Sequence, residues 1–170
     1  MLSFDIRTLA REAATVDAVI PADDAVWLDE DSRPAGEGIR VTGRLSQAGT
    51  DRYYFSGHIA GVTQQECRRC LTPTEAAVDA EVHALFAEGD AHEDDPDVYP
   101  VGGVRSDEID LRPALREQWL LEAPAFLVCR PDCKGLCPKC GADLNLGACG
   151  CAPETDARWE ALRKLRGASE

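Results

Sequence analysis

Apolar and polar residues alternate along three stretches of the chain, which predicts a β-rich core. Residues 38–47 alternate in this way and predict a half-buried strand, in which Gly43 is a candidate for a β-bulge. Residues 52–65 continue as a second long strand, and the turn-forming Ala-Gly-Thr-Asp between the two predicts a hairpin. Residues 74–88 alternate again, which favours a third strand although their alanines also suit a helix.

Three other stretches show helical spacing, in which apolar residues recur every three or four positions. The strongest predicts a helix over residues 110–122, capped by Asp110 and followed by Pro124. Weaker patterns predict helical structure within residues 3–13 and a final helix that begins near Thr155 and runs to Arg166. The apolar Ala-Phe-Leu-Val at 125–128 predicts a short strand. The apolar stripe of the strongest helix is Leu111, Leu115 and Trp119.

These elements predict an α+β fold with a mainly antiparallel β core, a packed helix, a C-terminal cysteine-rich module and a short last helix. We expect a β-rich domain over residues 1–128, and the cysteine-rich module with the C-terminal helix over residues 129–170. Residues 88–108 are rich in glycine, proline and acidic side chains and show no core-forming period. We therefore expect an acidic loop there.

The formal net charge is −13 at pH 7, and it is spread unevenly. Residues 84–125 carry 11 acidic and 3 basic side chains, whereas residues 126–170 carry 6 acidic and 7 basic ones. An acidic chain repels phosphate backbones and attracts basic partners, which argues against binding to DNA. No apolar run reaches about eighteen residues, so we expect no membrane span. The first residues lack the pattern of a secretion signal, so we expect a cytoplasmic protein with reduced thiols.

The cysteines divide into two sets of four, which predicts two structural zinc ions. In the first set, Cys137-Pro-Lys-Cys140-Gly is a knuckle that supplies two thiolates from one tight turn, and Cys149-Gly-Cys151 supplies two more. The second set joins distant parts of the chain, because one pair lies in the predicted hairpin turn and the other lies at the entrance to the module. Its members are Cys67, Cys70, Cys129 and Cys133.

Three other uses of the cysteines fit the sequence less well. Both Cys-x-x-Cys pairs have the spacing of a thioredoxin-like redox site, but no βαβ pattern surrounds them. A disulfide framework is disfavoured in a reducing compartment. A catalytic zinc keeps one coordination position open, whereas eight thiolates leave none. Phosphate-loop, serine-hydrolase and HExxH motifs are also absent from the sequence, so we expect no enzymatic activity.

Charged residues suggest two partner-binding regions. Basic residues lie in or beside the cysteine motifs, where they either offset the charge of zinc–thiolate centres or contact RNA phosphates. Acidic residues of the 88–108 loop either attract a basic partner or keep a tether solvated. The basic candidates are Arg68, Arg69, Lys134 and Lys139, and the acidic candidates are Glu93, Asp94, Asp95 and Asp97.

The order of these motifs resembles the YceD-type family, which comprises bacterial and plastid proteins linked to accumulation of the large-subunit (23S) ribosomal RNA. The matching segments are ECRRCL after a long hairpin, EIDLRPALREQWLLEAPAFLVC, RPDCKGLCPKCGADLNLGACGC and a short last helix, so the resemblance covers residues 38–166. It implies a non-enzymatic factor in ribosome biogenesis whose metal supports the fold. Because the chain is acidic, we expect a basic ribosomal protein as partner rather than direct rRNA contact. A thiol redox protein and a zinc-ribbon interaction module are the alternatives.

Overall fold

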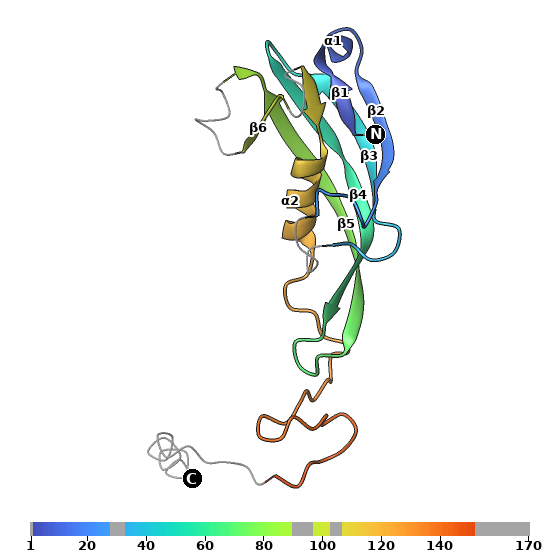
Figure 1. The fold of residues 1–170 in the computed structure, drawn as a ribbon, viewed down its shortest axis with the longest axis vertical. Coiled ribbons are helices and arrows are strands. Elements are labelled where there is room, and N and C mark those ends of the chain that lie inside the picture. The colour runs from blue at the N-terminus through green and yellow to red at the C-terminus, as the bar shows by residue number, and fades with distance from the viewer. Residues whose placement is uncertain (1, 28–32, 90–96, 103–106, 152–170) are drawn as a thin grey trace, which may run out of the picture.

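The computed structural model describes residues 2–27, 33–89, 97–102 and 107–151, and its main feature is a five-stranded sheet. The strand order is β2-β3-β4-β5-β6, and all neighbours are antiparallel except β5 and β6, which are parallel (Figure 1). A small antiparallel sheet pairs β1 with β7. The predicted α+β class with a mainly antiparallel core is confirmed. The strands are β1 (Ser3–Asp5), β2 (Ala14–Ile20), β3 (Ile39–Gln47), β4 (Arg52–Glu66), β5 (Pro73–Ala87), β6 (Val98–Pro100) and β7 (Glu108–Asp110).

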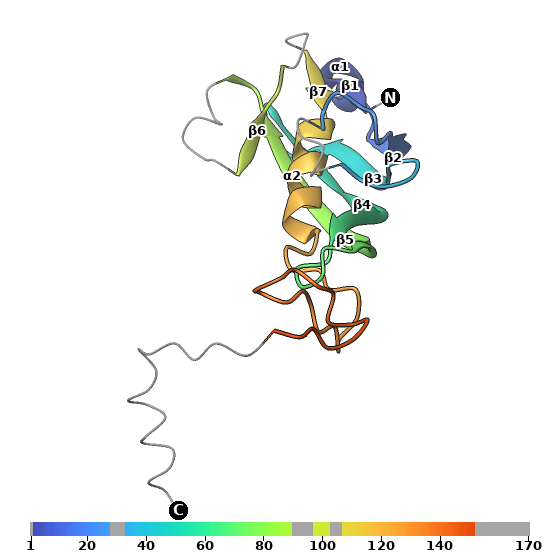
Figure 2. The same cartoon turned by 60° about the horizontal axis from the view of Figure 1, so that its bottom comes forward.

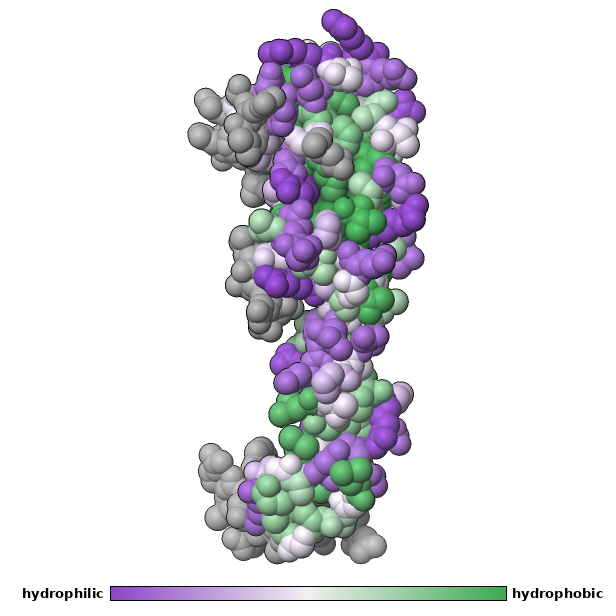
Figure 3. Space-filling view, turned by 45° about the vertical axis from the view of Figure 1, so that its right-hand side comes forward, coloured by the Kyte–Doolittle hydropathy of each residue, from purple (hydrophilic) through white to green (hydrophobic). Residues whose placement is uncertain are grey.

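The sheet is built around the hairpin of β4 and β5, two strands of 15 residues each that pair along their whole length. Side chains on both strands alternate between buried and exposed positions, which confirms the period of two predicted for residues 74–88. The partner of β4 on its other side, β3, reaches only as far as Ala60. The hairpin therefore extends beyond β3 and carries its turn away from the core (Figure 1), and the molecule narrows below its main body in the space-filling view (Figure 3).

The β-bulge considered at Gly43 is wrong, because the pairing register runs unbroken through this residue on both sides. Gly43 lies opposite Gly57, and a Cβ atom added at Gly43 would lie 2.6 Å from the Cα atom of Gly57 and 2.9 Å from the Phe55 ring. The two glycines thus leave room for the fully buried Phe55 side chain. They serve core packing rather than a change of register.

Helix α2 (Arg112–Glu122) packs against one face of the sheet, as its apolar stripe predicted (Figures 1 and 2). The rings of Trp119 and Trp27 meet edge to face, with centroids 6.3 Å apart. The N-cap residue is Leu111 rather than the predicted Asp110. The Asp110 carboxylate nevertheless accepts hydrogen bonds from the backbone and guanidinium N–H groups of Arg112, so it still stabilises the first turn. The stripe residues Leu111, Leu115 and Trp119 are all buried.

Three local predictions are wrong in detail. Within residues 3–13, only α1 (Ile6–Leu9) is helical, and β1 precedes it. Residues 125–128 form no strand, and the Phe126 side chain is exposed rather than buried in the core. The acidic loop contains β6, where Tyr99 packs on Phe86 of β5 at 5.5 Å and donates a hydrogen bond to Glu117.

Some predictions fall outside the described residues. The last helix, expected near residues 155–166, is one of them, and so are Glu93, Asp94 and Asp95. Among the described residues, no helix has the length and apolar character needed to cross a bilayer.

Candidate metal centres

The turn of the β4–β5 hairpin holds Cys67 and Cys70 in place. The Cys67 backbone N–H donates to the Thr72 carbonyl, and the Leu71 N–H donates to the Cys67 carbonyl, both at 2.9 Å. Leu71 adopts a left-handed conformation with φ 59°, which is uncommon for a branched side chain and closes the turn. Both sulfur-bearing side chains are buried. The turn therefore presents two thiols on its inner side.

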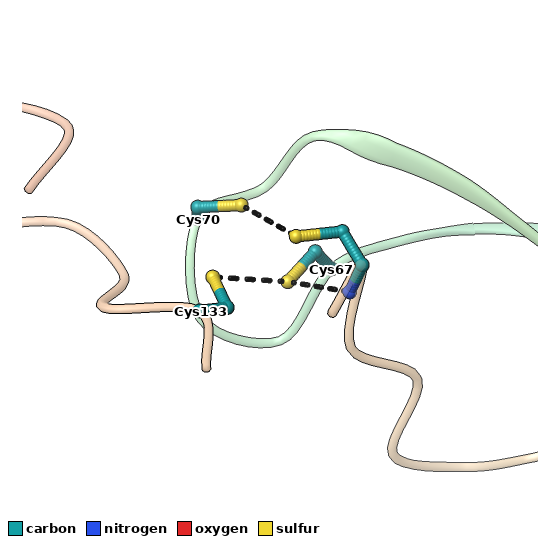
Figure 4. Close-up of side chains that lie close together, drawn as sticks. Cys67, Cys70 and Cys133 are labelled. Carbon is teal, nitrogen blue, oxygen red and sulfur yellow. Dashed lines mark hydrogen bonds between the residues drawn. The ribbon is translucent and has the colours of Figure 1, made fainter. Parts of the chain in front are cut away.

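Cys129 and Cys133 approach this turn from the segment after α2 and complete a four-sulfur cluster, which we call the hairpin set. Its Sγ atoms all lie within 4.8 Å of one another. The Sγ atoms of Cys67 and Cys133 are 3.9 Å apart, and those of Cys70 and Cys129 are 3.6 Å apart. Figure 4 shows the sulfurs of Cys67, Cys70 and Cys133 pointing toward one another.

These distances suit a tetrahedral thiolate site. Four sulfurs about 2.3 Å from a central zinc ion are about 3.8 Å from each other. A disulfide would instead bring two sulfurs to about 2.05 Å, and all eight cysteines of the protein are free thiols. The sulfurs of the hairpin set are therefore arranged as metal donors rather than as a covalent crosslink.

Backbone N–H groups favour the ligating form of Cys67. The N–H groups of Cys129 and Arg69 donate to its Sγ at 3.3 and 3.5 Å. The bond from Cys129 is the main cause that lowers the pKa of the Cys67 thiol to about 6. The pKa of Cys70 is also lowered, chiefly because its sulfur lies 3.3 Å from the Thr72 hydroxyl. A lowered thiol pKa favours the thiolate, which is the metal-binding form.

Residues 137–151 form a second four-sulfur cluster, which we call the loop set: Cys137, Cys140, Cys149 and Cys151. Its Sγ atoms also lie within 4.8 Å of one another. The knuckle turn is closed by the Gly141 N–H, which donates to the Cys137 carbonyl at 2.9 Å, and Gly141 takes a left-handed φ of 71°. The pKa of Cys137 is lowered to about 6, mainly by the N–H groups of Cys140 and Lys139.

Hydrogen bonds join the two sets directly. The Leu136 N–H donates to the Arg69 carbonyl, and the Leu144 N–H donates to the Gly135 carbonyl, both at 2.9 Å. The side chain of Asn145, which lies between the two cysteine pairs of the loop set, donates to Cys133 Sγ of the hairpin set at 3.5 Å. No sequence pattern singles out Asn145, because asparagine is common in turn-rich loops for reasons of backbone conformation alone.

The basic candidates play different parts. The Arg69 guanidinium donates to the carbonyls of Cys133 at 2.8 Å and of Pro131 at 3.4 Å, so it ties the hairpin turn to the facing segment. The Arg68 guanidinium instead lies over the exposed Phe126 ring, 4.6 Å from its centroid. Lys134 and Lys139 are exposed beside the cysteines. Of the acidic candidates, only Asp97 lies within the described residues, and it is exposed.

The donors suit a structural metal rather than a catalytic one. Each set offers four thiols, and neither includes a histidine or a carboxylate among the described residues. Four thiolates complete the tetrahedral shell that zinc prefers and leave no position for a substrate. The two clusters can therefore hold metal ions that stabilise the fold of residues 129–151 and fix the hairpin turn to it.

Comparisons with known proteins identify the family. The chain matches the family described as large ribosomal RNA subunit accumulation protein YceD over residues 55–166. An uncharacterised protein of Mycobacterium tuberculosis is 34% identical over 152 residues, which is 88% of this chain and 67% of that protein. An uncharacterised protein of Mycobacterium leprae is 30% identical over 145 residues, which is 83% of this chain and 66% of that protein.

A plant protein extends the comparison. The large ribosomal RNA subunit accumulation protein YCED homolog 1, chloroplastic, of Zea mays is 29% identical over 132 residues, which is 60% of this chain and 45% of that protein. No solved structure matches the chain significantly. The family match extends from within β4 through the hairpin turn and α2 and contains all eight cysteines. The chain therefore belongs to the YceD family of large ribosomal RNA subunit accumulation proteins.

Proposed function

We propose that this protein is a non-enzymatic cytoplasmic factor that supports accumulation of the large-subunit (23S) rRNA by binding a basic ribosomal protein. The observation that carries the proposal is the family match over residues 55–166, which includes both cysteine sets. The name of the maize relative also refers to accumulation of the large ribosomal RNA subunit. The closed thiol clusters offer no reaction centre, which supports a role in binding rather than in catalysis.

Zinc is the metal that we propose for both sets. Four thiolates per site are typical of structural zinc, and the free energy of metal binding contributes directly to the folding of such modules. Elemental analysis of reduced, purified protein is expected to find about two zinc ions per chain, since each set supplies one complete shell. Protein kept reduced throughout that contained no zinc would contradict the proposal. A value near one zinc ion per chain would contradict only one of the two proposed sites.

Acidic side chains on the outer face of β5 support a basic partner. Glu75, Asp79 and Glu81 alternate along this strand and are all exposed. Asp79 lies 2.6 Å from the His58 ring, and Glu81 lies 3.9 Å from the His83 ring. Ribosomal proteins that contact rRNA need basic surfaces, and opposite charge steers such a partner toward this face. The attraction should weaken as salt screens it over about 10 Å at 0.1 M ionic strength.

A second candidate, direct contact with rRNA, is favoured by one observation at the hairpin turn. Arg68 stacks over Phe126 beside an open groove of about 780 Å³, which is lined by Gln64, Leu71 and Ala125 among others. An exposed aromatic ring with a guanidinium over it is a surface on which an unpaired base can stack. The overall charge of −13 opposes this contact, so we give the protein partner priority.

A pull-down from lysate, with and without nuclease, separates the two candidates. We expect large-subunit components to stay bound after nuclease treatment. Joint neutralisation of Glu93, Asp94, Asp95 and Asp97 to the corresponding amides should reduce the amount recovered. The matched variant Arg68→Gln with Phe126→Ala should leave recovery unchanged. The partner is RNA, and our first proposal fails, if large-subunit components are lost after nuclease treatment and in the Arg68→Gln, Phe126→Ala variant but are recovered normally in the acidic-loop variant.

A further inference from the structure

One side chain of the loop set reaches the metal site of the hairpin set. The Asn145 amide nitrogen Nδ2 donates to Cys133 Sγ at 3.5 Å, and its oxygen Oδ1 accepts from the Lys134 backbone N–H at 2.8 Å. Asn145 follows Cys140 and precedes Cys149 in sequence, yet its amide contacts a sulfur of the other set. It lies where an outer-shell hydrogen bond to a metal-binding thiolate would lie.

The orientation of this amide is fixed by independent contacts. The Lys134 N–H can only donate, so the atom that faces it must be the amide oxygen. The Asp143 carboxylate can only accept, and the Asn145 Nδ2 atom lies 2.7 Å from its Oδ1 atom. Both contacts therefore place the N–H groups of Asn145 toward the sulfur and the carboxylate. The donor to Cys133 follows from this geometry and not from an arbitrary choice between the two amide ends.

Asn145 is held in this position by the loop of the loop set. The Asp143 carboxylate also accepts from the Asn145 backbone N–H at 2.8 Å, and Asp143 forms a β-bridge with Leu136, which adjoins Cys137. The loop between the Cys140 and Cys149 ligands thus sets where Asn145 points. Any event that frees this loop also withdraws a hydrogen bond from Cys133.

The two sets differ in how easily they can be reached. Three of the four cysteines of the hairpin set are buried, whereas Cys137 is the only buried cysteine of the loop set. A soluble competitor for metal therefore meets the sulfurs of the loop set first. Because the loop set is more accessible and also positions Asn145 against Cys133, a change in the loop set can alter metal binding by the hairpin set.

We propose that metal in the loop set strengthens metal binding by the hairpin set through Asn145, so that the exposed site governs the buried one. This inference rests on the proposed zinc occupancy. With the loop set filled, Asn145 is held against Cys133 and stabilises its thiolate. With the loop set empty, Asn145 is released and the hairpin set binds its ion more weakly. The connection between hairpin turn and C-terminal segment then depends on the state of the more exposed cluster.

The test measures zinc release from the full-length protein as a colour-forming chelator is titrated in. Wild-type protein is expected to lose its two ions in separate phases, with the loop set first. In Asn145→Ala, the chelator concentration that removes the first ion should fall by about 10- to 100-fold, because the coupling is reciprocal and the filled hairpin set no longer strengthens the loop set. Release of the second ion should not change, because in wild type Asn145 is already free when the loop set is empty. Leu146→Ala is the control, because this neighbouring side chain is 89% exposed, and it should behave as wild type.

A double-mutant cycle tests the coupling itself. Cys149→Ser should leave only the hairpin set occupied, and its ion should be released at the chelator concentration of the wild-type second phase, because the loop set is empty in both cases. Adding Asn145→Ala to Cys149→Ser should change this concentration by less than about twofold. A first phase in Asn145→Ala that is unchanged from wild type would overturn the inference, and so would an equally large shift of the hairpin ion when Asn145→Ala is added to Cys149→Ser. If Cys149→Ser holds no zinc, the single Asn145→Ala variant decides. Loss of ribosomal association with intact two-phase release would count against the proposed function and not against this coupling.

Discussion

The hairpin set and the loop set use the same four-thiol chemistry in opposite structural settings. The hairpin set joins residues 66 positions apart in sequence, and only a formed β4–β5 hairpin and a docked α2 bring them together. The loop set draws all its cysteines from residues 137–151 and needs only its own turns. The hairpin set therefore forms only after the domain has folded, whereas the loop set can organise residues 137–151 by itself. The β core depends on neither, because it is built from buried apolar side chains.

Removal of all metal should show this contrast most strongly. Structural zinc sites have apparent binding free energies of about 10–16 kcal/mol in zinc-finger peptides, so residues 125–151 should lose their structure with the metal. The sheet should persist, since Phe55, Ile59 and their neighbours remain packed. Hydrogen exchange followed by mass spectrometry can check this after chelation. Full loss of protection in β3 and β4 would show that the core also relies on the metal.

Single ligand substitutions should separate the two sets. Cys67→Ser should free the hairpin turn and expose residues 62–73 to proteolysis, because a buried thiolate of the fold-dependent site is lost. Cys149→Ser should leave the turn protected when zinc is in excess, because its sulfur is only partly buried and belongs to the self-contained loop. Each variant should retain about one zinc ion, as one complete shell remains. Equal protease sensitivity would remove the distinction between the sets.

Two glycines allow a finer test, since both have nearly the same left-handed backbone. Gly141→Ala, at φ 71°, has open space around the added Cβ atom and should cost about 1–2 kcal/mol from backbone strain alone. Gly135→Ala, at φ 73°, places that atom 2.7 Å from the Arg69 carbonyl oxygen and should cost more, because it also pushes the two sets apart. Denaturant unfolding of the zinc-loaded protein compares them. Equal losses would mean that the approach of Gly135 to Arg69 is not a tight contact in solution.

The smallest expected effect concerns alkaline pH and the core. Burial, together with a hydrogen bond to Glu88, raises the pKa of Tyr53 from 10 to about 12. A raised pKa in the folded state contributes stability that is present below about pH 10 and lost as the pH rises toward 12. Thiolate sites respond in the other direction, because they fail when acid protonates the sulfurs. Urea unfolding at pH 9 and above pH 11 should show a smaller alkaline loss in Tyr53→Phe than in wild type.

The sequence alone predicted those elements whose burial pattern is carried by their own residues. The alternation in residues 52–65 and 74–88 predicted β4 and β5 because one face of each strand is buried or half-buried along its length. The stripe of Leu111, Leu115 and Trp119 predicted α2 for the same reason. The grouping of the cysteines also followed from spacing, and the structure brings the same two sets of four together.

The sequence did not predict the structure of segments whose conformation depends on contacts with residues far away in the chain. Strand β6 has only three residues, and it exists because Tyr99 finds Phe86 and Glu117 across the core. Residues 125–128 are apolar enough for a strand, yet their backbone follows the hairpin turn, where the Leu127 carbonyl accepts from the Arg68 N–H. Asn145 likewise gains its importance only from Cys133, twelve residues away.

The separation of 66 residues between Cys67 and Cys133 also determines when the hairpin set can form during synthesis of the chain. The first cysteine pair leaves the ribosome well before its partners, and at about 5–20 residues per second the interval is roughly 3–13 s. During that time the two early thiols are an incomplete chelate that can be oxidised or can bind a metal with the wrong partners. A nascent chain thus passes through a vulnerable period that ends only when residues 129–133 emerge and close the site. Metal uptake by this cluster consequently reports that translation has passed α2 and that the domain has closed.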